Sequence, residues 1–132
     1  MSERTDLVRR AYETFSATND VEQVLPLFHP EFETSIPAEL SVEPDTYSGH
    51  DGVRRYMGSF YDVMDEITFE LVDTEEVGEW VIAHTLVHTR AHHTGIESAQ
   101  ELWLAWRFED GLAIEGRPYP SHEEALAGLA ER

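Results

Sequence analysis

Residues 80–119 read WVIAHTLVHTRAHHTGIESAQELWLAWRFEDGLAIEGRPY, and this stretch decides the fold. It holds three strand-like runs, at 80–93, 97–109 and 112–119. An Asp-Gly pair at 110–111 separates the last two, and Asp-Gly between such runs is a strong signal for a two-residue hairpin turn. Strands that follow one another through short turns pair antiparallel. The stretch therefore predicts an antiparallel meander.

The residues before the meander are mainly helical in pattern. Apolar side chains recur at helical spacing over residues 3–17. A second helix is expected to begin at the Asp20 cap and to kink or end early at Pro26, with His29-Pro30 as its stop. The other expected elements are a short strand at 31–35, a surface loop at 36–47, a helix at 49–64, a strand at 67–74 and a C-terminal helix that starts at the capping box 121–124.

This order of elements predicts the fold class. A chain of 132 residues has the size of one domain. Helices that precede a bent meander in so short a chain pack on one face of a strongly curved sheet. We therefore expect a single α+β domain over residues 1–132, with N-terminal helices on a strongly curved antiparallel sheet and a short C-terminal helix.

Composition excludes several classes of function. The chain has no cysteine and no lysine, which removes disulfides, thiolate metal sites and Schiff-base chemistry. The net charge of -18 disfavours nucleic acid and anionic membranes as partners. No apolar run has the ~18 residues that a membrane span needs, and the charged N-terminal residues do not read as a signal peptide. We expect a soluble, cytoplasmic protein.

Several local motifs, in this order and spacing, resemble the SnoaL-like and ketosteroid-isomerase-like branch of the NTF2-like superfamily. They are VRRAYETF at 8–15, LFHPEFE at 27–33, YSGHDGVRRY at 47–56, WRFEDG at 106–111 and YPSHEEAL at 119–126. The resemblance implies a cone in which helices close a curved sheet around a deep, mostly apolar pocket. It also implies pairing of two chains through the convex sheet face. The family includes isomerases, polyketide cyclases, dehydratases, epoxide hydrolases and non-catalytic proteins, so the resemblance does not fix a reaction.

The catalytic residues of the isomerases are not found at the aligned positions. Those enzymes use a carboxylate base, a tyrosine and a protonated aspartic acid. The aligned positions hold Ile36, Ala11 and Leu104. Tyr12 is one residue away from the tyrosine position, but a shift of one residue turns a helical side chain by ~100°. Steroid isomerisation by this machinery is therefore not expected.

Histidines are concentrated in the longest strand-like run. His84, His88 and His92 are four residues apart, which in a strand is a span of ~13 Å between neighbours, too far to share one metal ion. His92, His93 and Glu97 across the following turn form the remaining cluster of ligand types. We expect no metal and no cofactor, and we interpret His84 and His88 either as polar members of a sheet face or as a dimer contact.

The sequence leaves open which face of this strand is inward. Residues 81, 83, 85, 87 and 89 share one side, and Trp80, Ile82, His84 and His88 share the other. The family register places Leu104 and Trp106 inward. It then places Trp103 on the convex face beside Arg107, where an exposed indole suits a homodimer contact. The side chains expected to line the pocket are Tyr12, Phe15, Phe32, Tyr56, Phe60, Leu104, Trp106 and Tyr119.

Two functions remain as hypotheses. In the first, the chain is a cofactor-free acid–base enzyme for a hydrophobic carbonyl or polyketide-like compound. Its candidate catalytic groups are His29, Glu33, His84, His88, Glu101 and Arg117. In the second, it is a non-catalytic module for ligand binding or dimerisation. A third possibility is an acidic scaffold whose cone is filled by its own aromatic side chains.

Overall fold

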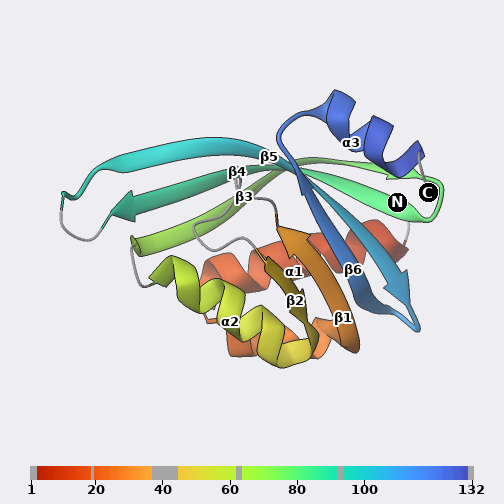
Figure 1. Ribbon diagram of the computed structural model, residues 1–132, viewed down its shortest axis with the longest axis horizontal. Coiled ribbons are helices and arrows are strands. Elements are labelled where there is room, and N and C mark those ends of the chain that lie inside the picture. The colour runs from red at the N-terminus through yellow and green to blue at the C-terminus, as the bar shows by residue number, and fades with distance from the viewer. Residues whose placement is uncertain (1–2, 19, 37–44, 62–63, 92–93, 131–132) are drawn as a thin grey trace.

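A computed structural model describes residues 3–18, 20–36, 45–61, 64–91 and 94–130 (Figure 1). In chain order the elements are α1 Glu3–Thr18, the 3-10 turns η1 Val21–Gln23 and η2 Leu25–Leu27, β1 Phe28–Ile36, β2 Asp45–Ser48, α2 Gly49–Tyr61, β3 Met64–Val77, β4 Trp80–Ala91, β5 Glu97–Glu109, β6 Leu112–Tyr119 and α3 His122–Ala130. No helix among these residues is long and apolar enough to cross a membrane.

The predicted meander is confirmed. Strands β3, β4, β5 and β6 pair antiparallel in sequence order. The turn between β5 and β6 has φ values of 54° at Asp110 and 76° at Gly111. Two positive φ values are what the predicted two-residue turn requires, and Asp and Gly adopt them at low cost. This turn fixes the register of the final hairpin.

The predicted α+β fold with a curved sheet and a short C-terminal helix is confirmed, but the sheet is mixed and not antiparallel throughout. The six strands run in the order β2-β1-β6-β5-β4-β3, and β1 pairs in parallel with β6. Residues Glu33 and Glu115, some eighty positions apart in the chain, lie opposite each other in this pair. No local signal specifies such a partner, because a strand's alternation records its two faces and not its neighbour.

The predicted second helix is also wrong in type. Residues 21–27 form two 3-10 turns, which end where β1 begins. The Asp20 cap is confirmed, since its side chain accepts a hydrogen bond from the Glu22 N–H at 3.0 Å. Pro26 lies in the second turn, and a proline removes a helical hydrogen bond and clashes with the preceding turn of an α-helix. As a result, His29-Pro30 lies inside β1 and not at a helix end.

The sheet separates two layers of helix. Figure 1 shows α1 and α2 against the concave face of the bent sheet and α3 against the convex face. On the concave side, Val81 and Ala83 pack with Val8 and Tyr12 of α1. On the convex side, Trp80, Ile82 and Ala105 pack with Ala125 and Leu129 of α3. The question that the sequence left open is thereby answered: Val81, Ala83, Thr85 and Val87 face inward, together with Leu104 and Trp106.

The C-terminal helix begins as its capping box predicts. The Ser121 hydroxyl accepts a hydrogen bond from the Glu124 N–H at 3.1 Å. The helix then lies on the sheet through Ala125 and Leu129. Helix α3 covers one end of the convex face. At that end β4 is buried on both faces, and its side chains there are apolar.

Candidate functional site

A cavity of about 160 Å³ lies between the helices and the concave face of the sheet. Its wall is almost entirely apolar. The polar residues on it are Tyr12, Thr34, Tyr56, Trp106 and Arg117. The principal apolar contributors are Leu7, Val8, Ala11, Phe15, Val21, Val24, Leu27, Phe28, Phe32, Val53, Met57, Phe69, Leu102, Leu104, Phe108, Ala113 and Pro118.

Trp106 is the centre of an aromatic cluster on this wall. Its ring is 6.0 Å from that of Phe28 and 6.1 Å from that of Phe32, with Phe32 stacked at 29°. A Cβ at Gly116 would lie 3.0 Å from the Trp106 ring and 3.2 Å from that of Phe32. Glycine at 116 therefore lets both rings lie against β6. Sequence reasoning missed this residue, although a glycine inside a strand often marks such a close approach.

A chain of hydrogen bonds joins the polar groups on the α1 side of the cavity. The Trp106 Nε1–H donates to the Tyr12 hydroxyl oxygen at 3.2 Å. That hydroxyl is also hydrogen-bonded to Thr85. The Thr85 hydroxyl donates to the Ala83 carbonyl at 3.1 Å. Thr85 is fully buried. Thr85 is a second residue that sequence reasoning missed; its signal was a hydroxyl between the apolar side chains of Ala83 and Val87 on the same strand face.

Burial perturbs the tyrosines of the cavity. It raises the pKa of Tyr12 to about 12, although the hydrogen bonds from Thr85 and Trp106 act in the opposite direction. The pKa of Tyr56 is also raised, first by burial and then by Tyr47 and Tyr12. Both phenols are therefore held neutral well above the pH at which exposed tyrosines ionise.

We expect the Tyr12→Phe variant to lose less stability than the wild type in alkaline solution. The folded-state pKa of Tyr12, about 12, is above its ordinary value of 10.0, so its contribution is complete below pH 10 and is lost as pH rises toward 12. Between those values the unfolded chain binds one proton fewer at this site, so the free energy of unfolding falls by about 1.4 kcal/mol per pH unit. Denaturant titrations from pH 9 to pH 12 should show a slope shallower by about that amount in Tyr12→Phe. Equal slopes would contradict the burial of this phenol.

Six of the eight predicted pocket residues lie around the cavity: Tyr12, Phe15, Phe32, Tyr56, Leu104 and Trp106. The side chain of Phe60 lies outside the described part of the chain. Tyr119 is on the other face, because it pairs with Trp103 and packs against α3, where a Cβ at Gly128 would lie 2.5 Å from its hydroxyl. The prediction for Tyr119 is wrong because β6 presents Gly116 and Pro118 to the cavity, and alternation turns residue 119 away.

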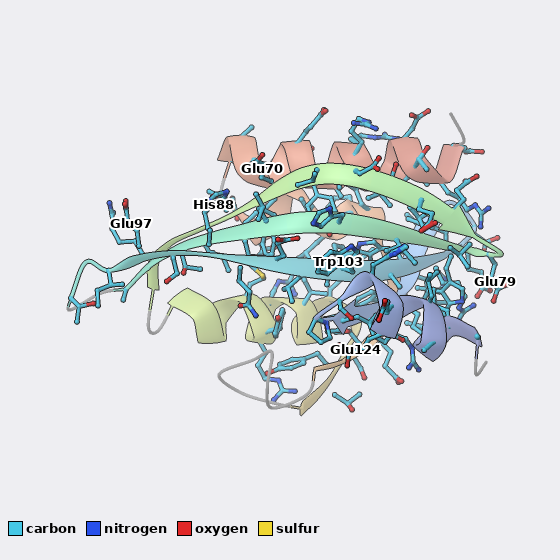
Figure 2. The ribbon with its side chains drawn as sticks, turned by 90° about the horizontal axis from the view of Figure 1, so that it is seen from above. Glu70, Glu79, His88, Glu97, Trp103 and Glu124 are labelled. Atoms are coloured by element: carbon cyan, nitrogen blue, oxygen red, sulfur yellow. The ribbon has the colours of Figure 1, made fainter. Side chains whose placement is uncertain are left out.

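The histidines of β4 face away from the cavity, which corrects their assignment as catalytic candidates there. The His84 ring stacks on Trp103 at 4.5 Å and 4°, and its Nε2 is 2.8 Å from Glu101 Oε2. His88 Nε2 is 3.1 Å from Glu70 Oε1. Figure 2 looks onto this convex face and labels His88, Glu70 and Trp103. The predicted neighbour of Trp103 was Arg107, but the structure places His84 there.

Arg107 and the remaining charged candidates also lie on the convex face. Arg107 donates to Glu115 at 3.1 Å, and Arg117 donates to the same carboxylate at 2.7 Å. Glu33 is exposed beside them. Arg117 borders the cavity as a residue of β6, while its guanidinium is held on the opposite face. Burial lowers the pKa of Arg117, but the hydrogen bonds and the charge interactions with Glu115 and Tyr119 together outweigh it and leave the pKa above its ordinary value, which disfavours a role as a base.

His29 belongs to the one group of described residues whose metal-ligating atoms come together. Its ring and the carboxylates of Glu109 and Asp110 have ligand atoms within 4.8 Å of one another. The His29 Nδ1 accepts a hydrogen bond from the Glu31 N–H at 3.0 Å. In the neutral ring this places the proton on Nε2, so neither nitrogen has a lone pair to offer a metal without breaking that bond. Of the expected cluster at the β4–β5 turn, His92 and His93 lie outside the described residues.

Comparison with known proteins places the chain in a family. Residues 8–116 match the family model of the SnoaL-like domain. The chain belongs to the SnoaL-like family. This confirms the resemblance seen in the sequence motifs, and members of the family include polyketide cyclases and isomerases. No curated protein matches this SnoaL-like chain.

Solved structures share the fold of this SnoaL-like protein. An NTF2-like protein of unknown function from Burkholderia pseudomallei is 23% identical with a TM-score of 0.80, over 96% of this chain and 97% of the other. TerC, co-crystallised with polyporic acid, is 20% identical with a TM-score of 0.79, over 99% and 100%. A SnoaL-like protein from Jannaschia is 12% identical with a TM-score of 0.73, over 98% of this chain and 93% of the other. At these identities the similarity shows a common fold.

Proposed function

We propose that this SnoaL-like protein binds a small, flat, largely apolar molecule in the cavity between α1, α2 and the sheet. The observation that carries the proposal is the character of the wall. Its described side chains are aliphatic or aromatic with a few neutral hydroxyl and indole groups, and no carboxylate or imidazole among them faces the cavity. Apolar walls with few polar groups are typical of small-molecule sites.

The wall favours binding over acid–base catalysis. A general acid or base must reach the proton it transfers, within ~3 Å or through one water. The predicted groups His84, His88, Glu33 and Arg117 are held on the convex face by partners of their own or lie exposed there. The phenols of Tyr12 and Tyr56 stay protonated near neutral pH, so neither is available as a general base there. Of the two hypotheses from the sequence, the binding module is therefore the better supported.

The volume limits the size of the ligand. An engineered cavity of about 150 Å³ lined by apolar side chains takes up benzene. The 160 Å³ here suits a compound with one six-membered ring. TerC was crystallised with polyporic acid, which supports the uptake of a small organic molecule by a chain of this fold.

We expect toluene to bind saturably and naphthalene to bind more weakly. The measurement is a titration followed by ligand-observed NMR and by the rise in melting temperature, together with native mass spectrometry of the freshly purified protein to detect a retained compound. The variant that tests the location of the ligand is Ala11→Leu. It fills part of the cavity from α1 and keeps good helix propensity. It should weaken toluene binding at least about tenfold, since roughly 1.4 kcal/mol of lost contact is enough for that. Equal binding by the wild type and Ala11→Leu would place the ligand elsewhere.

Pairing of two chains through the convex face stays a prediction. The half-buried His84–Trp103 stack lies on this face at the edge of the cluster that α3 covers. Each chain carries a net charge of -18, so association should strengthen as salt screens the repulsion. Light scattering at rising ionic strength measures this directly, and a monomer at every salt concentration would contradict it.

A further inference from the structure

We infer that the cavity also accepts a flat organic cation, such as an N-alkylated pyridine ring, which the aromatic faces of its wall and the negative charge of the chain stabilise. This inference rests on the proposed function and names a second class of ligand for the same site. N-methylpyridinium is the simplest member of that class. It has the shape of toluene and differs from it by one positive charge, so a comparison of the two compounds isolates the effect of charge.

The wall of the cavity offers aromatic faces to a ligand. Neighbouring rings are turned steeply against one another, by 72° between Phe28 and Trp106 and by 61° between Phe15 and Phe69. Rings in such different orientations present faces as well as edges to a ligand between them. The face of an aromatic ring is negative, and it attracts a cation that lies within ~6 Å of its centroid. The aromatic residues described on this wall are Tyr12, Phe15, Phe28, Phe32, Tyr56, Phe69, Trp106 and Phe108.

Trp106 is the ring best placed to present a face. Its indole is held at both ends. The Nε1–H donates to the Tyr12 oxygen at 3.2 Å, and a Cβ at Gly116 would lie 3.0 Å from Cζ3. These two contacts occupy opposite edges of the indole, so its faces are what it can offer to a ligand. Tryptophan is also the side chain whose face attracts a cation most strongly.

The charges around the described wall favour a cation. Arg117 is the cationic residue among those described on it, and its guanidinium is held by Glu115 at 2.7 Å on the opposite face of the sheet. Glu109 and Asp110 directly follow Phe108 of the wall and are exposed. The chain as a whole carries a net charge of -18. Low-dielectric walls focus such a field and raise the local concentration of cations.

A cavity without these features would reject the cation. Moving an isolated charge from water into apolar surroundings is strongly unfavourable unless the charge finds a partner. A cavity lined by aliphatic side chains would therefore take up toluene and exclude N-methylpyridinium. Aromatic faces offset part of this penalty, because the attraction between a cation and a ring is stronger where water is excluded.

The test measures toluene and N-methylpyridinium at neutral pH by ligand-observed NMR, alone and in competition. We expect N-methylpyridinium to displace toluene and to bind within about tenfold of its affinity, where an aliphatic cavity would disfavour the cation by roughly a hundredfold or more. Ala11→Leu should weaken the binding of both compounds, because they share one cavity. Between about 20 mM and about 500 mM NaCl, the affinity for the cation should fall roughly threefold or more, and that for toluene should not fall.

Fluorinated tryptophan isolates the contribution of the ring face. Fluorine makes the face less negative and hardly changes the shape of the ring. Of the three tryptophans, Trp106 lines the cavity, whereas Trp80 and Trp103 pack in the cluster on the convex face. We therefore expect uniform labelling with 6-fluorotryptophan, whose fluorine is not on the Cζ3 that meets Gly116, to weaken N-methylpyridinium binding roughly threefold and toluene binding less. In the matched control, Trp106→Phe, the same labelling should have no effect on either ligand.

Phe69→Leu tests a second ring and leaves Trp106 in place. Leucine keeps an apolar side chain on the wall and removes the aromatic face. The ratio of N-methylpyridinium to toluene affinity should then fall roughly threefold. This ratio is the readout, because the hydration of each free ligand is the same in every variant. Melting temperatures establish that each variant is folded.

The outcomes distinguish the two claims. If toluene fails to bind the wild type, the proposed function fails. If toluene binds but N-methylpyridinium does not displace it, any binding of the cation is to the acidic surface; the inference is then overturned and the binding function stands. The inference is also overturned if fluorination and Phe69→Leu both leave the affinity ratio unchanged in folded protein.

Discussion

Replacing Phe32 with alanine is expected to lower the free energy of unfolding by about 3–5 kcal/mol. Phe32 is 2% exposed, and its ring is 4.8 Å from that of Phe28 and 6.1 Å from that of Trp106. Removing it costs the transfer of a buried ring and leaves a void beside an existing cavity, where the rigid rings cannot collapse to fill it. Urea unfolding of both proteins measures the difference.

The same substitution should change the ligand that the cavity takes. Because the void adjoins the cavity, naphthalene should raise the melting temperature of Phe32→Ala more than that of the wild type. The control is Ile96→Ala at a side chain that is 63% exposed, which should change stability by less than about 0.5 kcal/mol. A loss below about 1 kcal/mol for Phe32→Ala would mean that this ring is not part of a rigid wall.

Two glycine-to-alanine changes in the same helix should have opposite signs. Gly52 and Gly58 both lie in α2. A Cβ at Gly58 would meet nothing within 4 Å, so Gly58→Ala should stabilise the protein by about 0.5–1 kcal/mol through helix propensity alone. A Cβ at Gly52 would lie 2.8 Å from the backbone carbonyl carbon of Tyr47 in β2, and Tyr47 is fully buried.

We expect Gly52→Ala to lose about 1–3 kcal/mol despite its better helix propensity, because backbone atoms of two packed elements must move apart. Chemical denaturation of both variants gives the sign directly. The displacement should also disturb the Tyr47 ring, which packs 5.0 Å from Tyr56 at the cavity, so Gly52→Ala should weaken toluene binding while Gly58→Ala should not. A stabilised Gly52→Ala would show that α2 does not lie so close to β2.

Predictions that rested on signals within one segment of the chain were more accurate than predictions that depended on contacts between distant segments. The helix over residues 3–17 and the strand over residues 97–109 agree with α1 and β5, because helical spacing and the flanking turns lie within each segment. The second helix was wrong where one proline outweighed its apolar spacing. The parallel pairing of β1 with β6 had no local signal at all.

The candidate site was predicted in part for a related reason. Its aromatic wall follows from helical spacing in α1 and from the family register of β5, and the structure places Tyr12, Phe15, Leu104 and Trp106 around the cavity. The histidines were assigned to it because the alternation of β4 could not say which face was inward. Both faces of that strand are apolar near Trp80, since α1 covers one and α3 covers the other.

The sequence by itself determined the order of helices and strands, the final hairpin and the capped helix ends. It also determined membership of the SnoaL-like family. Each of these is encoded in residues close together in the chain. Only the tertiary structure decided which face of the sheet encloses the cavity and which polar groups meet on its wall. Trp106 donates to a tyrosine 94 positions away, and Thr85 of another strand bonds to the same hydroxyl. Such a chain of hydrogen bonds exists only when α1, β4 and β5 are packed together, because its members are far apart in the sequence.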